Sequence, residues 1–183
     1  MNAELEPLLK GKLIRLRELE RRDLSEMYVA WLNDPEVNAH LFVGRSPATM
    51  DSLNAYFESN SANRNVVMFA ILDGESGAHI GNVRLDMYDT LSRIVDWGIM
   101  IGEKRFWGRG IAQEVARPTL AWAFERWSAH KITLGVSYGN TAAIKACENA
   151  GFKIEGRQRS QIYEGGAYVD KILMGLLRED LPA

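Results

Sequence analysis

Apolar and polar residues alternate along several short segments of the chain, a period-two pattern that is typical of β-strands with one buried face. The pattern predicts about seven strands, which cover 13–19, 65–72, 80–87, 94–101, 131–138, 153–163 and 168–177. Glycine-containing turns separate two pairs of these strands, at Asp73-Gly74 and at Gly165-Gly166. Such turns favour hairpins, so we expect the sheet to be mostly antiparallel.

Helical spacing between the strands predicts about four helices. The first is expected to begin at Asp23, whose spacing to Glu26 fits a capping box, and to stop at 33–35, which read Asn-Asp-Pro. Ser46 followed by Pro47 is typical of a second helix start, with serine as the cap and proline in the first turn. The remaining helices are expected near 112–127 and 141–150.

The order of these elements predicts an α/β (α+β) fold, in which helices flank a mixed, mostly antiparallel twisted sheet. The chain has 183 residues and no linker or repeat, so we expect a single domain over 1–183. The net charge is −2, with acidic and basic residues interspersed. This balance argues against a nucleic-acid binder, which needs a basic face.

Cysteine and histidine usage narrows the chemistry further. Cys147 is the only cysteine, which excludes an intrachain disulfide and a zinc site built from cysteines. The three histidines show no ligand spacing, so no metal is expected. The first residues lack the apolar run of a signal peptide, and the longest apolar stretch, 66–72, is too short to span a membrane. We therefore expect a cytoplasmic protein that does not act at a membrane.

A small-residue loop follows the strand predicted at 94–101 and leads into a helix. It contains Gly108 and Gly110, which allow close approach of a ligand to the backbone. Backbone N–H groups and a helix N-terminus together suit a pyrophosphate, but the short Gly-x-Gly pattern alone favours a plain strand-to-helix turn. The segment lacks the Gly-Lys-Ser/Thr of a nucleotide-triphosphate loop and the third glycine of a Rossmann fingerprint.

A second informative segment covers 140–152. On a helix, Asn140, Ala143 and Cys147 fall on one face. The simpler interpretation is a capped core helix in which Cys147 is a small buried hydrophobic residue.

Together the two segments resemble a known superfamily. Residues 107–112, Trp-Gly-Arg-Gly-Ile-Ala, are similar to the (Gln/Arg)-x-x-Gly-x-(Gly/Ala) pyrophosphate loop of the GCN5-related N-acetyltransferases (GNAT). Residues 140–152 resemble the second signature, Asn-x-x-Ala…Gly-Phe, and the order of elements agrees over nearly the whole chain. Residues 31–37 and 106–110 are similar to the subgroup that contains ribosomal-protein N-terminal, spermidine and amino-sugar acetyltransferases. The chain departs from the pattern at Trp107, where Gln or Arg is usual, and at Cys147, where many members carry a tyrosine that protonates the CoA thiolate.

The resemblance implies transfer of an acetyl group from acetyl-CoA to a primary amine, by direct attack in a ternary complex. It assigns the pantetheine arm to the backbone of the fourth strand and the pyrophosphate to the loop. The implied cofactor-binding residues are Ile99, Met100, Ile101, Trp107, Gly108, Arg109, Gly110, Ile111, Ala112, Gln113, Asn140 and Ala143. A non-catalytic acyl-CoA-binding module with the same fold is the alternative, and the missing tyrosine favours it.

Asp96 is the best candidate for the catalytic base. Period-two alternation puts it on the same strand face as Gly98, which leaves a recess beside an acid for a substrate amine. A structural hydrogen bond or surface ion pair is the alternative for Asp96. Cys147 is a candidate acid, although packing explains it better, and solvent, Tyr163 or Tyr168 could take that role.

The acceptor side is the least determined part of the site. Its candidate residues are Trp31, Asn33, Arg84, Asp86, Tyr163 and Tyr168. Plain structural roles are the alternative for the two strand residues and the two tyrosines. Acids with aromatics fit an amino sugar, a polyamine or a peptide N-terminal amine about equally well. A polyamine site would usually have more clustered acids, which favours an amino sugar or a peptide N-terminal amine. Exposed sheet edges would also allow a homodimer.

Overall fold

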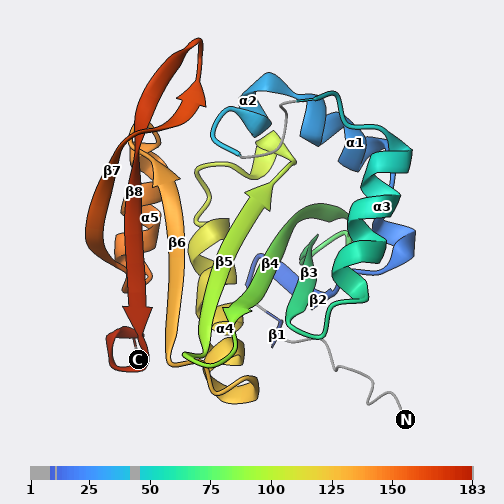
Figure 1. Cartoon of the computed structure of the whole chain (residues 1–183). Coiled ribbons are helices and arrows are strands. Elements are labelled where there is room, and N and C mark those ends of the chain that lie inside the picture. The colour runs from blue at the N-terminus through green and yellow to red at the C-terminus, as the bar shows by residue number, and fades with distance from the viewer. Residues whose placement is uncertain (1–8, 11, 42–45, 183) are drawn as a thin grey trace.

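The structure is a computed structural model that describes residues 9–10, 12–41 and 46–182. Its described strands form one eight-stranded sheet in the order β1-β2-β3-β4-β5-β6-β8-β7 (Figure 1). They are β1 Leu9–Lys10, β2 Ile14–Glu18, β3 Val66–Asp73, β4 His79–Asp89, β5 Ile94–Ile101, β6 Lys131–Ser137, β7 Lys153–Glu164 and β8 Ala167–Leu177. All neighbouring pairs are antiparallel except β5 and β6, which are parallel. The seven predicted strands and the mostly antiparallel sheet are confirmed, and β1 is an additional two-residue strand.

The helices lie on both sides of this sheet. They are α1 Glu26–Asn33, α2 Pro35–Asn38, α3 Met50–Ser61, α4 Ile111–Arg126 and α5 Thr141–Asn149, with short 3-10 helices at Arg21–Asp23, Lys104–Phe106 and Arg178–Asp180. The largest apolar core contains residues of α4, α5 and one sheet face. Two smaller clusters join α1, α2 and α3 to the other face. In the described chain, none of the helices is long and apolar enough to cross a membrane.

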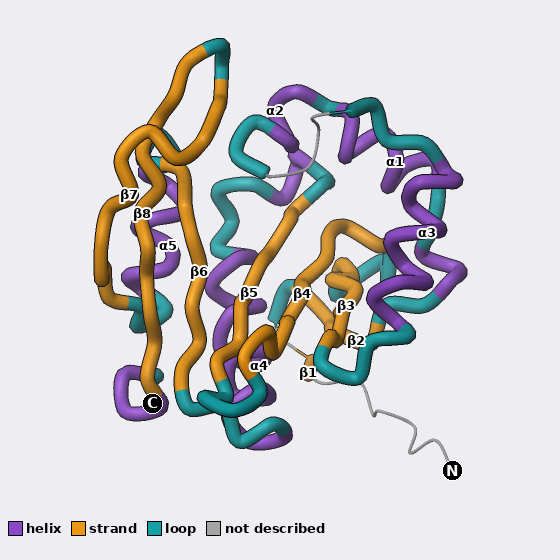
Figure 2. The backbone as a smooth tube through the Cα atoms, viewed as in Figure 1, coloured by secondary structure: helices purple, strands orange, loops and turns teal. Residues whose placement is uncertain are grey.

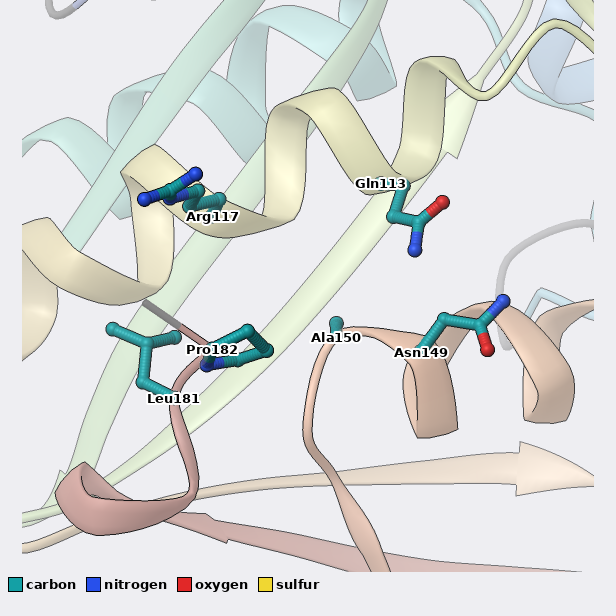
Figure 3. A pocket seen from close by; sticks show the side chains of 6 residues that line it. All are labelled: Gln113, Arg117, Asn149, Ala150, Leu181 and Pro182. Atoms are coloured by element: carbon teal, nitrogen blue, oxygen red, sulfur yellow. The ribbon is translucent and has the colours of Figure 1, made fainter.

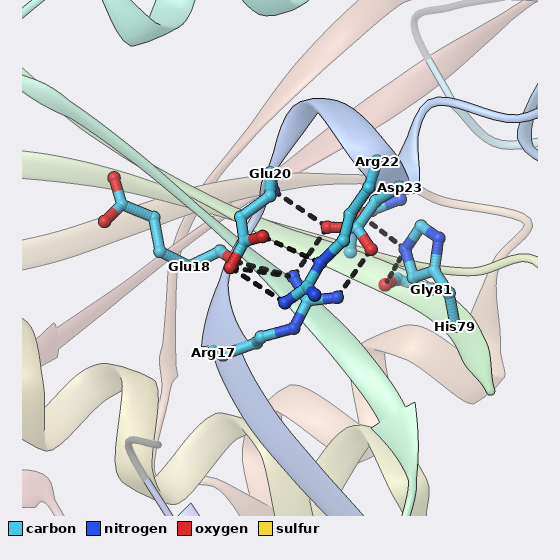
Figure 4. A network of polar contacts seen from close by, with 8 residues as sticks. Arg17, Glu18, Glu20, Arg22, Asp23, His79 and Gly81 are labelled. Atoms are coloured by element: carbon cyan, nitrogen blue, oxygen red, sulfur yellow. Dashed lines mark hydrogen bonds and ion pairs between the residues drawn. The ribbon is translucent and has the colours of Figure 1, made fainter. Parts of the chain in front are cut away.

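The predicted start of α1 at Asp23 is wrong. Ser25 caps the helix, because its Oγ accepts a hydrogen bond from Tyr28 N at 3.3 Å. Asp23 is instead buried and accepts two hydrogen bonds from the Arg17 guanidinium, both at 2.6 Å, and one from Glu20 N at 2.8 Å (Figure 4). Burial alone would raise the pKa of Asp23, but these hydrogen bonds hold its pKa below the ordinary value.

The predicted start of α3 is also corrected. Thr49, rather than Ser46, caps this helix in a capping box with Ser52. The sequence Asn-Asp-Pro at 33–35 ends α1 as expected, but it also starts a further short helix, α2. Asp34 caps α2 and Pro35 is its first residue.

The alternation predicted for β5 is confirmed by burial. Val95 and Trp97 belong to the core beneath α4, whereas Met100 packs on the opposite face against the cluster of α1 and α3. The Trp97 indole donates a buried hydrogen bond to Thr119 Oγ1 of α4 at 3.0 Å. Packing and this bond fix the strand, so Asp96 faces away from α4.

Candidate active site

The parallel strands β5 and β6 are paired over a short distance only. Their register contains Ile94↔Lys131, Val95↔Ile132 and Asp96↔Thr133, and no pair beyond these in the described chain. Past this point the strands diverge, as the ribbon and the tube both show (Figures 1 and 2). The edge of β5 from 97 to 101 therefore has no strand partner on the β6 side, and its backbone groups can pair with an extended ligand.

The loop after β5 brings backbone N–H groups to the start of α4. Gly108 and Gly110 have φ of 72° and 79°, a left-handed conformation that glycine adopts without steric cost. A Cβ at either residue would meet no atom within 4 Å, so the loop surface is open toward a ligand. Gly110 is the residue before α4, whose first N–H groups lack partners within the helix. The loop is thus left-handed and open at both glycines, and pyrophosphate binding there stays a prediction.

Side chains of the loop hold it against the sheet. The Trp107 indole donates a hydrogen bond to the Ile101 carbonyl at 2.8 Å, which ties the loop to the end of β5. Phe106 is buried, and the Arg109 guanidinium lies over its ring, 5.6 Å from the centroid. Lys104 forms ion pairs with Asp34 at 2.7 Å and with Glu36 at 2.5 Å. Contacts of Lys104, Phe106 and Trp107 therefore hold the loop in place. Arg109, which lies between the two glycines, is exposed.

Asn140 caps helix α5. Its Oδ1 accepts a hydrogen bond from Ala143 N at 3.0 Å. The side chain thus has the capping role that the sequence analysis gave as the simpler interpretation. A contact between Asn140 or Ala143 and the co-substrate stays a prediction.

A pocket of about 230 Å³ lies between α4 and α5 near the C-terminus (Figure 3). Gln113 and Arg117 line it from successive turns of α4, and Asn149 lies on the opposite side. Gln113 belongs to the predicted cofactor-binding set, whereas Arg117 was not predicted. The pocket provides a cation, Arg117, about two helical turns beyond the glycine loop.

On the opposite face of β5, Asp96 lies beside charged residues of β4 and β8. Asp86 is its cross-strand partner. A Cβ at Gly98 would meet no atom within 4 Å, so the space beside this exposed residue is open, and the recess predicted next to Asp96 stays a prediction. Burial raises the pKa of Asp96, Arg84 and Lys171 lower this pKa, and Asp86 raises it, with a net upward shift.

Arg84 links Asp86 to helix α3. Its Nη2 donates to Asp86 Oδ2 at 2.7 Å, and its Nε donates to Asn60 Oδ1 at 2.9 Å. Asn60 is a buried residue of α3. The predicted pair of Arg84 and Asp86 is therefore an ordered network beside Asp96, and not two separately solvated residues.

Lys171 and Asn60 were both missed by the sequence interpretation. The Lys171 side chain lies over Gly135, where a Cβ would be 1.9 Å from Cε, and its charge acts on Asp96. Gly135, two residues along β6 from Ser137, the register partner of Lys171, is a weak sequence signal for this close approach. For Asn60, the sequence offers no signal, because its partner Arg84 lies on a distant segment.

Cys147 lies in the main apolar core and is 8% exposed. Burial raises the pKa of its thiol to about 11. An ordinary thiol has a pKa of about 8.5, so proton transfer from Cys147 to a thiolate of that kind would be uphill. The apolar surroundings therefore favour a packing role for Cys147 over a role as the general acid.

Two predicted acceptor residues, Trp31 and Asn33, have structural contacts within the chain. Trp31 is 6% exposed and packs against Gly102, where a Cβ would be 2.0 Å from the indole. It also contacts the His79 ring, with centroids 5.2 Å apart. Asn33 exchanges two hydrogen bonds with the backbone of Ala48, at 2.9 and 2.8 Å. Trp31 is thereby withdrawn from solvent, whereas Asn33 stays exposed, and a substrate contact of either residue stays a prediction.

Tyr163 and Tyr168 form a cross-strand aromatic pair near the tip of the β7–β8 hairpin. They are register partners, with ring centroids 5.2 Å apart and exposures of 60% and 70%. Tyr168 lies seven residues along β8 from the level of Asp96, because Gly175 pairs with Thr133. At 3.3 Å per residue this is roughly 20 Å or more of strand. The structure does not bring these tyrosines to Asp96.

Comparison with known proteins now identifies the class. The sequence profile of the acetyltransferase (GNAT) domain matches residues 14–153. The chain therefore belongs to this family of acetyl-CoA-dependent N-acetyltransferases.

Among its relatives is a Bacillus subtilis protein provisionally named a ribosomal N-acetyltransferase, 25% identical over 174 residues, or 91% of this chain and 92% of the relative. The Escherichia coli K12 spermidine N(1)-acetyltransferase is 28% identical over 165 residues, or 88% of this chain and 84% of the relative. A crystal structure of a Vibrio cholerae spermidine N-acetyltransferase in complex with CoA and spermine matches with a TM-score of 0.84 and 25% identity, covering 93% of this chain and 98% of that one. The superfamily predicted from the two sequence signatures is confirmed.

Proposed function

We propose that this chain acetylates a primary amine that binds beside Asp96, and that the acceptor is a peptide N-terminal amine or an amino sugar. The observation that carries the proposal is the divergence of β5 and β6 at Asp96, with the glycine loop at the other end of the exposed β5 edge. One binding path thus leads from an anion site to a carboxylate.

The residues of this path suit acetyl-CoA. Backbone N–H groups around Gly108 and Gly110 would bind the pyrophosphate, with Arg109 adding positive charge. Gln113 and Arg117 would face the nucleotide end. The β5 backbone from 99 to 101 would pair with the pantetheine arm and orient an N–H toward the thioester oxygen, where negative charge develops.

The reaction itself needs one proton removed and one supplied. An ammonium acceptor loses a proton through Asp96 or a water held by it, and the neutral amine attacks the thioester carbon. The new C–N bond forms and the C–S bond breaks, so that CoA leaves as a thiolate. Solvent protonates that thiolate, because Cys147 lies in the apolar core.

The charge distribution supports the acceptor class. Asp86 and Asp96 on this face are accompanied by Arg84 and Lys171, so the face is balanced rather than strongly acidic. A balanced face favours an acceptor with both polar and charged groups over a simple polycation. The relatives named for ribosomal and spermidine acetylation support an amine acceptor in general.

Thermal unfolding with acetyl-CoA, CoA, ATP and NAD tests the co-substrate. A ligand at a hundred times its Kd stabilises the folded protein by about 2.7 kcal/mol. Stabilisation by acetyl-CoA and CoA alone supports the proposal, and a panel of peptides, amino sugars and polyamines monitored by thiol release then identifies the acceptor. No stabilisation by either CoA species would contradict it. Stabilisation without acetylation of any amine would favour the non-catalytic acyl-CoA-binding module. The presence of Cys147, where many family members carry a tyrosine, is the sequence feature that supports this alternative.

A further inference from the structure

A second polar site lies on the acceptor side, away from Asp96. Ser137, the last residue of β6, is 2% exposed, and its hydroxyl has no hydrogen-bond partner among the described residues. Glu164 at the tip of the β7–β8 hairpin has a buried Oε2 that also lacks a partner there. Both side chains lie near Gly139, because Glu164 Oε1 and Ser137 Oγ are 3.8 and 3.9 Å from the position that a Gly139 Cβ would take.

Buried polar atoms without partners are uncommon and costly. A carboxylate can only accept hydrogen bonds, and a buried carboxylate needs a counter-charge. His40 supplies one partner, with its Nδ1 2.9 Å from Glu164 Oε1. The second oxygen remains, so the group that is missing here is a hydrogen-bond donor.

Ser137 lies on the same sheet face as Asp96. Ile132, Leu134 and Val136 point into the core with α5, so Thr133 and Ser137 point to the other side. Thr133 is the register partner of Asp96. Ser137 lies four residues further along β6, which corresponds to roughly 13 Å at 3.3 Å per residue.

We propose that Glu164 and Ser137 form a distal subsite for the acceptor, which binds a protonated amine or guanidinium roughly 10–13 Å from the amine that is acetylated. The proposal rests on acetyl transfer at Asp96 as proposed above. The cation donates hydrogen bonds to Glu164 Oε2 and Ser137 Oγ. His40 either keeps its contact with Glu164 Oε1 or is displaced by the cation. The acceptor is therefore at least dicationic before acetylation, as in a basic peptide or a multiply aminated sugar.

The test compares acceptors that differ only in the distal charge. The peptide arm uses Ala-Ala-Ala-Arg amide against its citrulline analogue, and the small-molecule arm uses 1,8-diaminooctane against octylamine. We expect the charged acceptor of an arm to have a kcat/KM about tenfold higher or more, chiefly through KM. The arm that shows the difference identifies the source of the cation.

Variants then test whether Glu164 and Ser137 cause this preference. Glu164→Gln keeps the shape and should abolish the preference, and Ser137→Ala should reduce it severalfold. His40→Ala should keep it, because the imidazole is a neighbour and not the acceptor of the hydrogen bond. Glu155→Gln is the matched control, because Glu155 lies on the same hairpin and pairs with Lys131 at 2.6 Å.

Two results would overturn the subsite: a wild-type chain that does not prefer the charged acceptor in either arm, or a preference that survives in Glu164→Gln. Equal losses in Glu164→Gln and His40→Ala would also overturn it, because a purely structural ion pair needs both members. Calorimetric binding of the same peptide pair separates this question from catalysis. A chain that acetylates nothing contradicts the proposed function, and the difference in binding still tests the subsite.

Discussion

Asp86 and Asp96 lie directly opposite each other on β4 and β5, as cross-strand partners of an antiparallel pair. Like charges in this position repel each other, and burial further disfavours the ionised form of Asp96. Arg84 reduces the repulsion through its bond to Asp86. The site thus contains a carboxyl group that accepts a proton more readily than an ordinary aspartate.

Replacing Asp96 should separate activity from stability. Asp96→Asn should lower kcat/KM for the amine by about 10²–10⁴-fold, the usual contribution of a general base. Asp51→Asn on the exposed part of α3 is the control. If activity survives within a few-fold, Asp96 is structural.

The same variant has a stability signature. The folded-state pKa of Asp96 is raised, so the wild-type chain loses stability as pH rises from the unfolded value, about 3.9, through the folded value. Asp96→Asn should therefore unfold at an equal or higher temperature than wild type at pH 7, and this advantage should vanish below about pH 3.9. A lower unfolding temperature at pH 7 would show that the ionised carboxylate stabilises the fold.

Arg84→Met should move the acidic limb of the kcat/KM profile to higher pH. The guanidinium lowers the pKa of Asp96, so its removal raises that pKa further. Arg15→Met, on the exposed side of β2, should leave the limb unchanged. A limb that does not move would mean that Asp96 does not govern the pH dependence.

Gly110→Ala should weaken acetyl-CoA binding about tenfold, because the loop must keep a left-handed residue and an open surface where the pyrophosphate binds. A matched control exists in Gly77, in the β3–β4 turn, whose φ of 71° is close to the 79° of Gly110. A Cβ meets no atom within 4 Å at either position. Both alanine variants should lose about 1–2 kcal/mol of stability, and binding titrations should distinguish them. Equal acetyl-CoA affinities would remove the loop from the cofactor site.

Cys147→Ala should retain kcat within about threefold while losing about 1 kcal/mol of unfolding free energy, as expected of a small core truncation. Steady-state rates and thermal unfolding on the same preparation test this. A loss of a hundredfold or more in kcat, in a folded variant, would instead assign the thiol a part in protonating the leaving group.

Most of the fold was predictable because alternation and turn residues act locally. The exceptions have physical reasons. β1 has only two residues, too few for a period, and the cap expected at Asp23 is overridden by a tertiary ion pair with Arg17.

The site was predictable where backbone conformation matters, as at Gly108 and Gly110. It was not predictable where distant segments meet. Trp31 is a candidate acceptor residue from the sequence, but its contact with Gly102, a residue distant in the chain, buries it. The contact of His40 with Glu164 joins two segments that are far apart in the sequence, and no local pattern relates them.

The short pairing of β5 with β6 also bears on how the two parts of the sheet hold together. Only three residue pairs join β1–β5 to β6–β8 through the described sheet. A pantetheine arm lying along 99–101 would add hydrogen bonds at this seam, much as a further strand does. The co-substrate would then be a removable part of the sheet, and amide hydrogen exchange along both diverging edges would slow when acetyl-CoA is abundant and quicken when it is scarce.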